Sequence, residues 1–204
     1  MKRSLLKLLV LAFGAAWLLA GCASGYLLDS TVQSFSNLPA LPAQPGYRFD
    51  RLPSQQSPAQ AQLEAWADSA LHQAGLRRDD ANPRFTVQVT ARLDAVLSPW
   101  ADPWRYGGWR GGWGMGYRHH GFGLGMGGPW GGLGESPWYH REVAVIVREL
   151  PGNRVAFESH ASNDGPWLDN TAVFPALFEA AMQGFPNPPA GPRQVNIQIG
   201  GAKP

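Results

Sequence analysis

Hydrophobic and polar residues alternate along two long stretches of this 204-residue chain. In residues 84–94, RFTVQVTARLD, every second side chain from Phe85 to Leu93 is apolar. Such alternation predicts a strand with one buried and one solvated face, which is typical of an antiparallel sheet. Residues 139–149 repeat the pattern, but Ile146 makes their second face partly apolar. We therefore expect this second stretch to be a central or covered strand.

Further strands are predicted where apolar residues alternate between turn residues. Pro151-Gly152-Asn153 has the composition of a turn, and Val155 and Phe157 after it are expected to face the core. The further predicted strands are residues 29–36, 47–52, 154–162 and 195–199.

A helix is predicted between Ser57 and Gly75. Ser57 suits the N-cap, Pro58 suits the first helical position, and Gln60 completes a capping box. Gly75 is a suitable stop at the other end. The apolar residues that recur at helical spacing are Leu63, Trp66, Ala67, Ala70, Leu71 and Ala74.

A second helix is predicted over residues 171–183. Pro175 has no N–H group to donate within a helix, so it is expected in the first turn. The expected buried side consists of Phe174, Leu177, Phe178, Ala181 and Met182.

These elements predict an α+β fold: a mostly antiparallel β-sheet with two amphipathic helices packed on one face. The predicted order is β-β-α-β, an insertion, then β-β-α-β. Val145, Phe157 and Phe178 are expected to be buried where the sheet meets the helices.

The chain has a single cysteine, Cys22, which follows a basic start and thirteen uncharged residues from Leu8 to Ala20. A lone cysteine forms neither an intramolecular disulfide nor a multi-cysteine metal site. A basic start before about 7–15 apolar residues is typical of a secretory signal, whereas a membrane-spanning helix needs about 20. We predict a signal peptide at residues 1–21, with an uncleaved membrane anchor as the alternative.

Leu19-Ala20-Gly21-Cys22 resembles the lipobox of bacterial lipoproteins. The resemblance implies cleavage before Cys22, diacylglycerol on its thiol and a third acyl chain on the new amino terminus. Three chains make a durable anchor, so Cys22 is expected to attach lipid and not to catalyse. No aspartate follows Cys22, and the resemblance then implies the outer membrane, facing the periplasm.

Removal of the signal peptide changes the charge of the chain. The formal charge of +2 includes three basic residues and no acidic residue within residues 1–21, so 14 basic and 15 acidic residues remain. A basic footprint is the first requirement for binding nucleic acid, and none remains. We therefore expect no nucleic-acid partner.

Residues 99–138 form an insertion of a different composition. Half of the 28 residues from Gly107 to Gly134 are glycine, and six of the nine tryptophans lie between Trp100 and Trp138. Ordering so much glycine is costly, which favours a flexible loop. The alternative is a binding surface for lipid headgroups, glycan or protein, because aromatic residues and arginine are common anchors at interfaces. The candidate binding residues are Trp104, Trp109, Trp113, Tyr117 and Trp130.

Several apparent motifs lack the context that their chemistry needs. Gly123-x-Gly125-x-x-Gly128 has neither the preceding strand nor the following helix of a dinucleotide site. No carboxylate or cysteine in the sequence completes a metal site with the histidines, which leaves adventitious binding at most. No nucleophile elbow and no pair of catalytic carboxylates is evident; Asp79-Asp80 is best interpreted as a solvated turn. We therefore predict no catalytic residue, no metal and no cofactor beyond the lipid on Cys22. The histidines considered are His119, His120, His140 and His160.

The layout of residues 29–199 resembles the bacterial envelope lipoproteins called domain of unknown function 4136. The resemblance rests on Tyr47-Arg48-Phe49, on the Leu63–Gly75 helix followed by Pro83-Arg84-Phe85-Thr86-Val87, and on the paired strands before a helix that ends Gly184-Phe185-Pro186. Where the family often has tryptophan, this chain has Phe157. The resemblance implies a location and a fold but no activity.

Together these observations predict a lipidated tether at residues 22–28, one domain at 29–199 interrupted by 99–138, and a tail at 200–204. The expected function is a non-catalytic outer-membrane lipoprotein that binds an envelope protein or glycan, or supports an assembly. The alternative is an enzyme acting on envelope glycans or lipids, with its site under the aromatic insertion.

Overall fold

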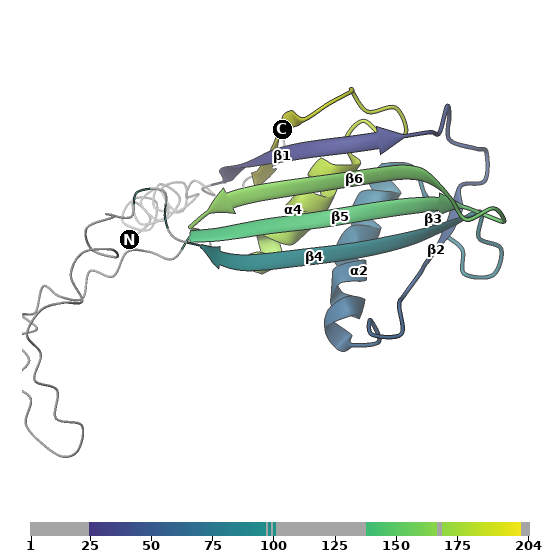
Figure 1. Cartoon of the computed structure of the whole chain (residues 1–204), viewed down its shortest axis with the longest axis horizontal. Coiled ribbons are helices and arrows are strands. Elements are labelled where there is room, and N and C mark those ends of the chain that lie inside the picture. The colour runs from purple at the N-terminus through teal and green to yellow at the C-terminus, as the bar shows by residue number, and fades with distance from the viewer. Residues whose placement is uncertain (1–24, 97, 99, 101–137, 167–168, 201–204) are drawn as a thin grey trace, which may run out of the picture.

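The computed structural model describes residues 25–96, 98, 100, 138–166 and 169–200. In this part of the chain, one seven-stranded sheet carries two helices on the same side (Figure 1). The α+β class predicted from the sequence is confirmed. The elements are β1 (Tyr26–Ser36), β2 (Gly46–Phe49), α2 (Pro58–Gln73), β3 (Arg77–Arg78), β4 (Phe85–Val96), β5 (Trp138–Glu149), β6 (Arg154–Gly165), α4 (Asn170–Met182) and β7 (Arg193–Ile199).

The sheet is mixed rather than mostly antiparallel, which corrects the sequence prediction. Its order is β3-β2-β4-β5-β6-β1-β7, and β2 runs parallel to both β3 and β4. The chain leaves β2, passes through α2 and returns to the end of the sheet at which β2 began. A crossover of this kind places the following strand parallel to β2. Side chains alternate between the two faces in parallel and antiparallel strands alike, so the sequence pattern could not reveal the parallel pairing of β2. The two-residue strand β3 was not predicted.

The core lies between the sheet and the helices. Phe85, Val87 and Val89 of β4 are buried, as are Val145 and Phe178, and this confirms the predicted inner face. The alternating valines of β5 and most of α4 belong to the same cluster. Beyond Val89 the prediction fails, because Ala91 and Leu93 are exposed. Apolar and polar residues go on alternating along β4 beyond the part of the strand that the rest of the protein covers.

A bulge in β6 changes which side chains face the core. Val147 pairs with Phe157, whereas the next residue, Arg148, pairs with Val155, so Ala156 is the extra residue. Ala156 and Phe157 are both buried, and Val155 is only half-buried. The prediction for Phe157 is confirmed and that for Val155 is wrong, because an extra residue reverses the alternation.

The start of α2 follows the sequence signals. The Ser57 hydroxyl accepts from the Gln60 N–H at 3.3 Å, and Pro58 is the first helical residue. The Gln60 side chain does not complete the capping box; it donates to the Val89 carbonyl at 3.3 Å and ties the helix to β4.

Helix α4 begins earlier than predicted. Asp169 is its N-cap, and its side chain accepts from the N–H groups of Thr171 and Ala172. Pro175 therefore lies inside the helix and not in its first turn. The buried side predicted for this helix is confirmed, and Val173, Ala176 and Ala180 are buried as well. A helix apolar on most sides is stable only when it is covered on most sides, and α4 contacts α2 and four strands.

Several predictions lie outside the described residues: the signal peptide, Cys22, and the five aromatic candidates from Trp104 to Trp130. Within the described residues, no helix is both long enough and apolar enough to cross a membrane. Trp100, at the start of the insertion, is 85% exposed.

Candidate functional site

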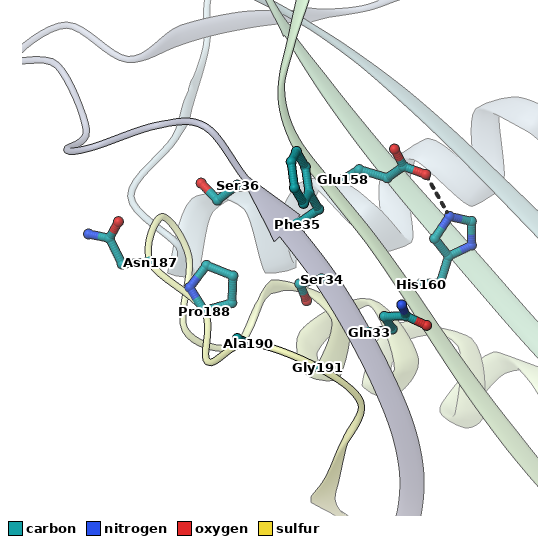
Figure 2. A pocket seen from close by; sticks show the side chains of 10 residues that line it. All are labelled: Gln33, Ser34, Phe35, Ser36, Glu158, His160, Asn187, Pro188, Ala190 and Gly191. Atoms are coloured by element: carbon teal, nitrogen blue, oxygen red, sulfur yellow. Dashed lines mark hydrogen bonds and ion pairs between the residues drawn. The ribbon is translucent and has the colours of Figure 1, made fainter.

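A pocket of about 710 Å³ lies where β1 ends beside the loop that joins α4 to β7 (Figure 2). We call it the edge pocket. Its walls are the last residues of β1, Gln33 to Ser36, then Glu158 and His160 of β6, and loop residues between Asn187 and Gly191. These walls come from three segments that are distant in the sequence.

The composition of the loop explains why the pocket exists. Residues 186–192 contain four prolines, which have no N–H group to donate to a neighbouring strand. Gly184 and Gly191 have positive φ angles of 84° and 82°, which suit the turns that leave α4 and enter β7. Strand β7 consequently begins only at Arg193, which pairs with Val32. The part of β1 beyond Val32 pairs with β6 alone.

A chain of hydrogen bonds fixes the floor of the pocket. Ser159 donates to the Ala181 carbonyl at 2.7 Å, so its hydroxyl accepts from Ser34 at 2.9 Å. The Ser34 hydroxyl in turn accepts from Arg193 Nη1 at 3.1 Å, and Arg193 Nη2 donates to the Gln183 carbonyl at 2.8 Å. The loop, β1, β6 and the end of α4 are thereby held together.

A second bond holds the far side of the loop. Asn187 Nδ2 donates to the Pro39 carbonyl at 3.2 Å, just after β1. The loop is therefore fixed to β1 on both sides of the pocket.

The outer rim of the pocket carries a histidine between two carboxylates. His160 Nδ1 lies 3.1 Å from Glu142 Oε1, and His160 Nε2 lies 3.0 Å from Glu158 Oε1. Burial alone would lower the pKa of His160, but the hydrogen bonds to Glu158 and Glu142 outweigh it, and the pKa is raised. The imidazolium form donates to both carboxylates at once. The cluster then carries a net formal charge of −1.

The orientation of the His160 ring bears on what the pocket can do chemically. A histidine that acts as a base needs one ring nitrogen directed at the group it deprotonates. Both nitrogens of His160 already face carboxylates, and the Ser34 hydroxyl belongs to the hydrogen-bond chain of the floor. What the pocket offers is an amide at Gln33, a carboxylate at Glu158 and the ring of Phe35, which is 60% exposed.

A larger depression of about 990 Å³ lies at the opposite edge of the sheet, around β3. Arg77 Nη1 donates to the carbonyls of His72 and Leu76 at 2.9 and 2.8 Å. Arg78 Nε lies 3.2 Å from Asp80 Oδ2 at the exposed surface. These arginines stabilise the local turn, so we attribute a structural role to them.

The histidines near β5 and β6 have carboxylate partners that the sequence did not reveal. His140 Nδ1 lies 2.8 Å from Asp164 Oδ1, and His160 lies between Glu142 and Glu158. These carboxylate partners were not foreseen from the sequence, because cross-strand pairing brings residues together that are distant in the chain. His140 and His160 do not share a site. Asp164, the partner of His140, is four positions from His160 on β6, about 13 Å along the strand. Within the described residues, no three or more His, Cys, Asp or Glu side chains are arranged so that they could hold a metal ion, the cluster at His160 included.

Asp79 has the role predicted for it. Its Oδ1 accepts from the N–H groups of Ala81 and Asn82 at 3.1 and 2.9 Å, as expected of an aspartate in a turn.

Two buried charges were also missed. Glu64 is 3% exposed and binds Arg51 through two contacts of 2.6 Å, which ties α2 to the segment after β2. Arg141 is 1% exposed; its Nε donates to Asn170 at 2.9 Å and its guanidinium lies over the Tyr139 ring. Arg141 alternates in step with the buried valines of β5, so the sequence did contain a signal that it is buried. No sequence pattern near Glu64 indicated that this residue is buried.

The comparisons with known proteins give a family and weak structural likenesses. The profile of a family described as "Domain of unknown function (DUF4136)" matches residues 30–187. No curated protein matches the chain.

The solved structures that match this chain include two PelC dodecamers from Paraburkholderia phytofirmans. One is 14% identical, with 75% of this chain and 94% of that chain covered and a TM-score of 0.44. The other is 11% identical, with 78% and 99% covered and a TM-score of 0.46. A PDZ domain protein from Parabacteroides distasonis is 10% identical, with 87% and 40% covered and a TM-score of 0.48. At these scores the likenesses carry no information on the partner of this chain.

Proposed function

The chain belongs to the DUF4136 family, and from that premise we propose that it is a non-catalytic lipoprotein of the outer membrane that binds a partner at the edge pocket. The single observation that carries the binding role is the pocket itself. It combines an exposed aromatic ring with amide and carboxylate groups on a rigid sheet, and these are common features of binding surfaces.

The paired state of its ionisable groups favours binding over catalysis. His160 engages Glu142 and Glu158, so the charges of the rim are balanced within the protein before any partner arrives. An enzyme acting on envelope glycans or lipids would need an acid, a base or a nucleophile directed into the pocket. His160 and the Ser34 hydroxyl are instead engaged by other groups of the protein.

The location is proposed from the start of the sequence. The lipobox-like Leu19-Ala20-Gly21-Cys22 would place three acyl chains at the amino terminus, and β1 begins at Tyr26 only a few residues later. The domain would therefore sit close to the membrane, facing the periplasm. Its partner would be a protein or a glycan of the envelope.

Site-specific crosslinking in intact envelopes tests the proposal. A photoreactive residue replaces Gln33, which lines the edge pocket, or Gln62, which is exposed on α2 and serves as the matched control. We expect a discrete covalent adduct from position 33 and none from position 62. Equal adducts from both positions, or none from position 33, would reject a partner at the pocket.

A further inference from the structure

The backbone of β1 in the edge pocket points partly away from its one partner strand. The Asn37 N–H donates to the Ala156 carbonyl of β6 at 2.8 Å. In an antiparallel ladder, alternate residues turn their N–H and C=O groups to opposite edges. Counting back from Asn37, Gln33 and Phe35 face β6, whereas Ser34 and Ser36 face the pocket. These two serines therefore present two N–H and two C=O groups to it.

Within the described residues, no neighbouring strand uses these groups. β7 ends its pairing with β1 at Val32, and no backbone hydrogen bond joins the stretch from Gln33 to Ser36 to the loop at residues 187–192. Figure 2 shows the loop passing beside this part of β1 with Pro188, Ala190 and Gly191 along it. The row of the sheet that β7 occupies is thus vacant opposite these four residues.

We propose that the edge pocket binds an extended peptide segment of a partner protein, which adds to the sheet as a short strand antiparallel to β1. This rests on the proposed function and specifies both the partner's chemistry and how it is held. Main-chain bonds to an exposed sheet edge give affinity in such complexes, and side-chain pockets give specificity. A pocket of about 710 Å³ lies within the usual range for bound ligands.

The rim predicts the composition of the peptide. Its residue opposite Phe35 points to the outer face, beside an exposed ring, and an apolar side chain suits that position. Its residue opposite Gln33 lies two strands from His160, and Glu158 lies diagonally from it, two residues further along β6 and about 12 Å away, which the lysine and glutamate side chains can span together. The cluster of Glu142, His160 and Glu158 is net negative, so a basic residue there is complementary. Small polar residues suit the positions opposite Ser34 and Ser36.

The test uses the full chain in mild detergent and a defined probe, the peptide acetyl-Ser-Thr-Val-Thr-Lys-amide, which ends before Val32, where Arg193 of β7 is already paired. Its two threonines lie opposite Ser36 and Ser34, its valine opposite Phe35 and its lysine opposite Gln33. Amide hydrogen exchange is followed by NMR. We expect the peptide to slow exchange at Ser34 and Ser36, with little change at Phe35, whose N–H already faces β6.

Three comparisons separate strand addition from other binding. Methylation of both threonine nitrogens removes two hydrogen bonds and should weaken binding about tenfold or more. Lysine-to-glutamate replacement in the peptide should also weaken it. In the protein, Ala190→Trp should block the pocket, whereas Ala59→Trp, at an exposed position of α2, should leave binding unchanged.

Each result decides the inference. Protection of Ser34 and Ser36 that is lost on N-methylation and in Ala190→Trp supports it. No protection at about 10 mM peptide, where even millimolar affinity gives clear occupancy, overturns it. Binding insensitive to N-methylation also overturns it, as does protection at β7 in place of Ser34 and Ser36. If position 33 still yields a specific adduct in envelopes after such a result, the proposed function stands and only strand addition fails.

Discussion

At the scale of single residues, His160 joins two strands on the open face of the sheet. Its ring contacts Glu158 of its own strand and Glu142 of β5, while Gln33 of β1 lies opposite it. The side chain is 44% exposed, so solvent screens the pair and the energy involved is modest. The arrangement nevertheless depends on the proton of the ring.

Stability should therefore fall as the pH rises through the pKa of His160. The folded pKa is raised above the ordinary value of 6.5, so the native state holds the proton more tightly than the unfolded chain. The contribution is fully present below about pH 6.5 and is lost as the pH rises through the higher, folded value. His160→Gln should remove this part of the pH dependence in urea denaturation followed from about pH 5 to about pH 8.

NMR titration of the His160 ring gives the control. The double variant Glu142→Gln and Glu158→Gln removes both carboxylates, so the pKa of His160 should drop. An unchanged pKa in that variant would contradict the cause that we assign.

At the scale of elements, α4 connects the parts of the fold. It packs on β5, β6, β1 and β7 and against α2, where Phe174 stacks on Trp66. Its end also accepts the Ser159 hydroxyl beneath the edge pocket. The position of α4 therefore sets both the core and the loop that opens the sheet edge.

Truncation of Phe178 should reveal this dependence. The side chain is fully buried, so Phe178→Ala should lower the free energy of unfolding by about 3–5 kcal/mol through lost contacts and a cavity. Phe35→Ala is the matched control: that ring is 60% exposed, and the change should stay within about 0.5 kcal/mol. Urea denaturation measures both. Equal midpoints for the two variants would reject the central role of α4.

At the scale of the whole molecule, we expect the glycine-rich insertion to be dispensable for folding. Val96 at the end of β4 pairs with Trp138 at the start of β5, so the chain enters and leaves the insertion at adjacent points of the sheet. The buried core of the described residues is formed by other segments. A short connection could therefore join the two strands as a hairpin.

Replacement of residues 104–136 by a short Gly/Ser linker should leave far-UV circular dichroism and thermal stability nearly unchanged. Binding of the unlipidated protein to anionic vesicles should weaken, and salt should weaken it further if arginine contributes. Salt-insensitive loss of glycan binding would instead indicate aromatic stacking. An unfolded variant would show that the insertion belongs to the core.

The anchor makes a separate prediction for the whole molecule. Cys22→Ser should abolish acylation and release the protein from the outer-membrane fraction, because the thiol is the expected site of diacylglycerol. Mass spectrometry and fractionation of the envelope measure the two effects. A normal acylated mass in the variant would refute the anchor.

The sequence by itself determined the local elements. The cap at Ser57, the buried stripe of α2 and the inner faces of β4 and β5 follow from residues that are consecutive or a turn apart, and such periodicity is visible in the letters. It also located the one cysteine and the unusual insertion. The alternation gave a wrong prediction at two positions. At Val155 a bulge in β6 shifts the alternation, and at Leu93 the rest of the protein no longer covers β4.

Only the tertiary structure decided the sheet order and the candidate site. Ser34 and Ser159 are 125 positions apart, and the loop at Asn187 reaches Pro39 across 148. The parallel pairing of β2, the partners of His160 and the vacant row beside β1 all depend on which strands become neighbours. Strand pairing is a property of the whole packed chain, in which each segment competes for the same core, and the alternation of a single strand is equally compatible with several neighbours.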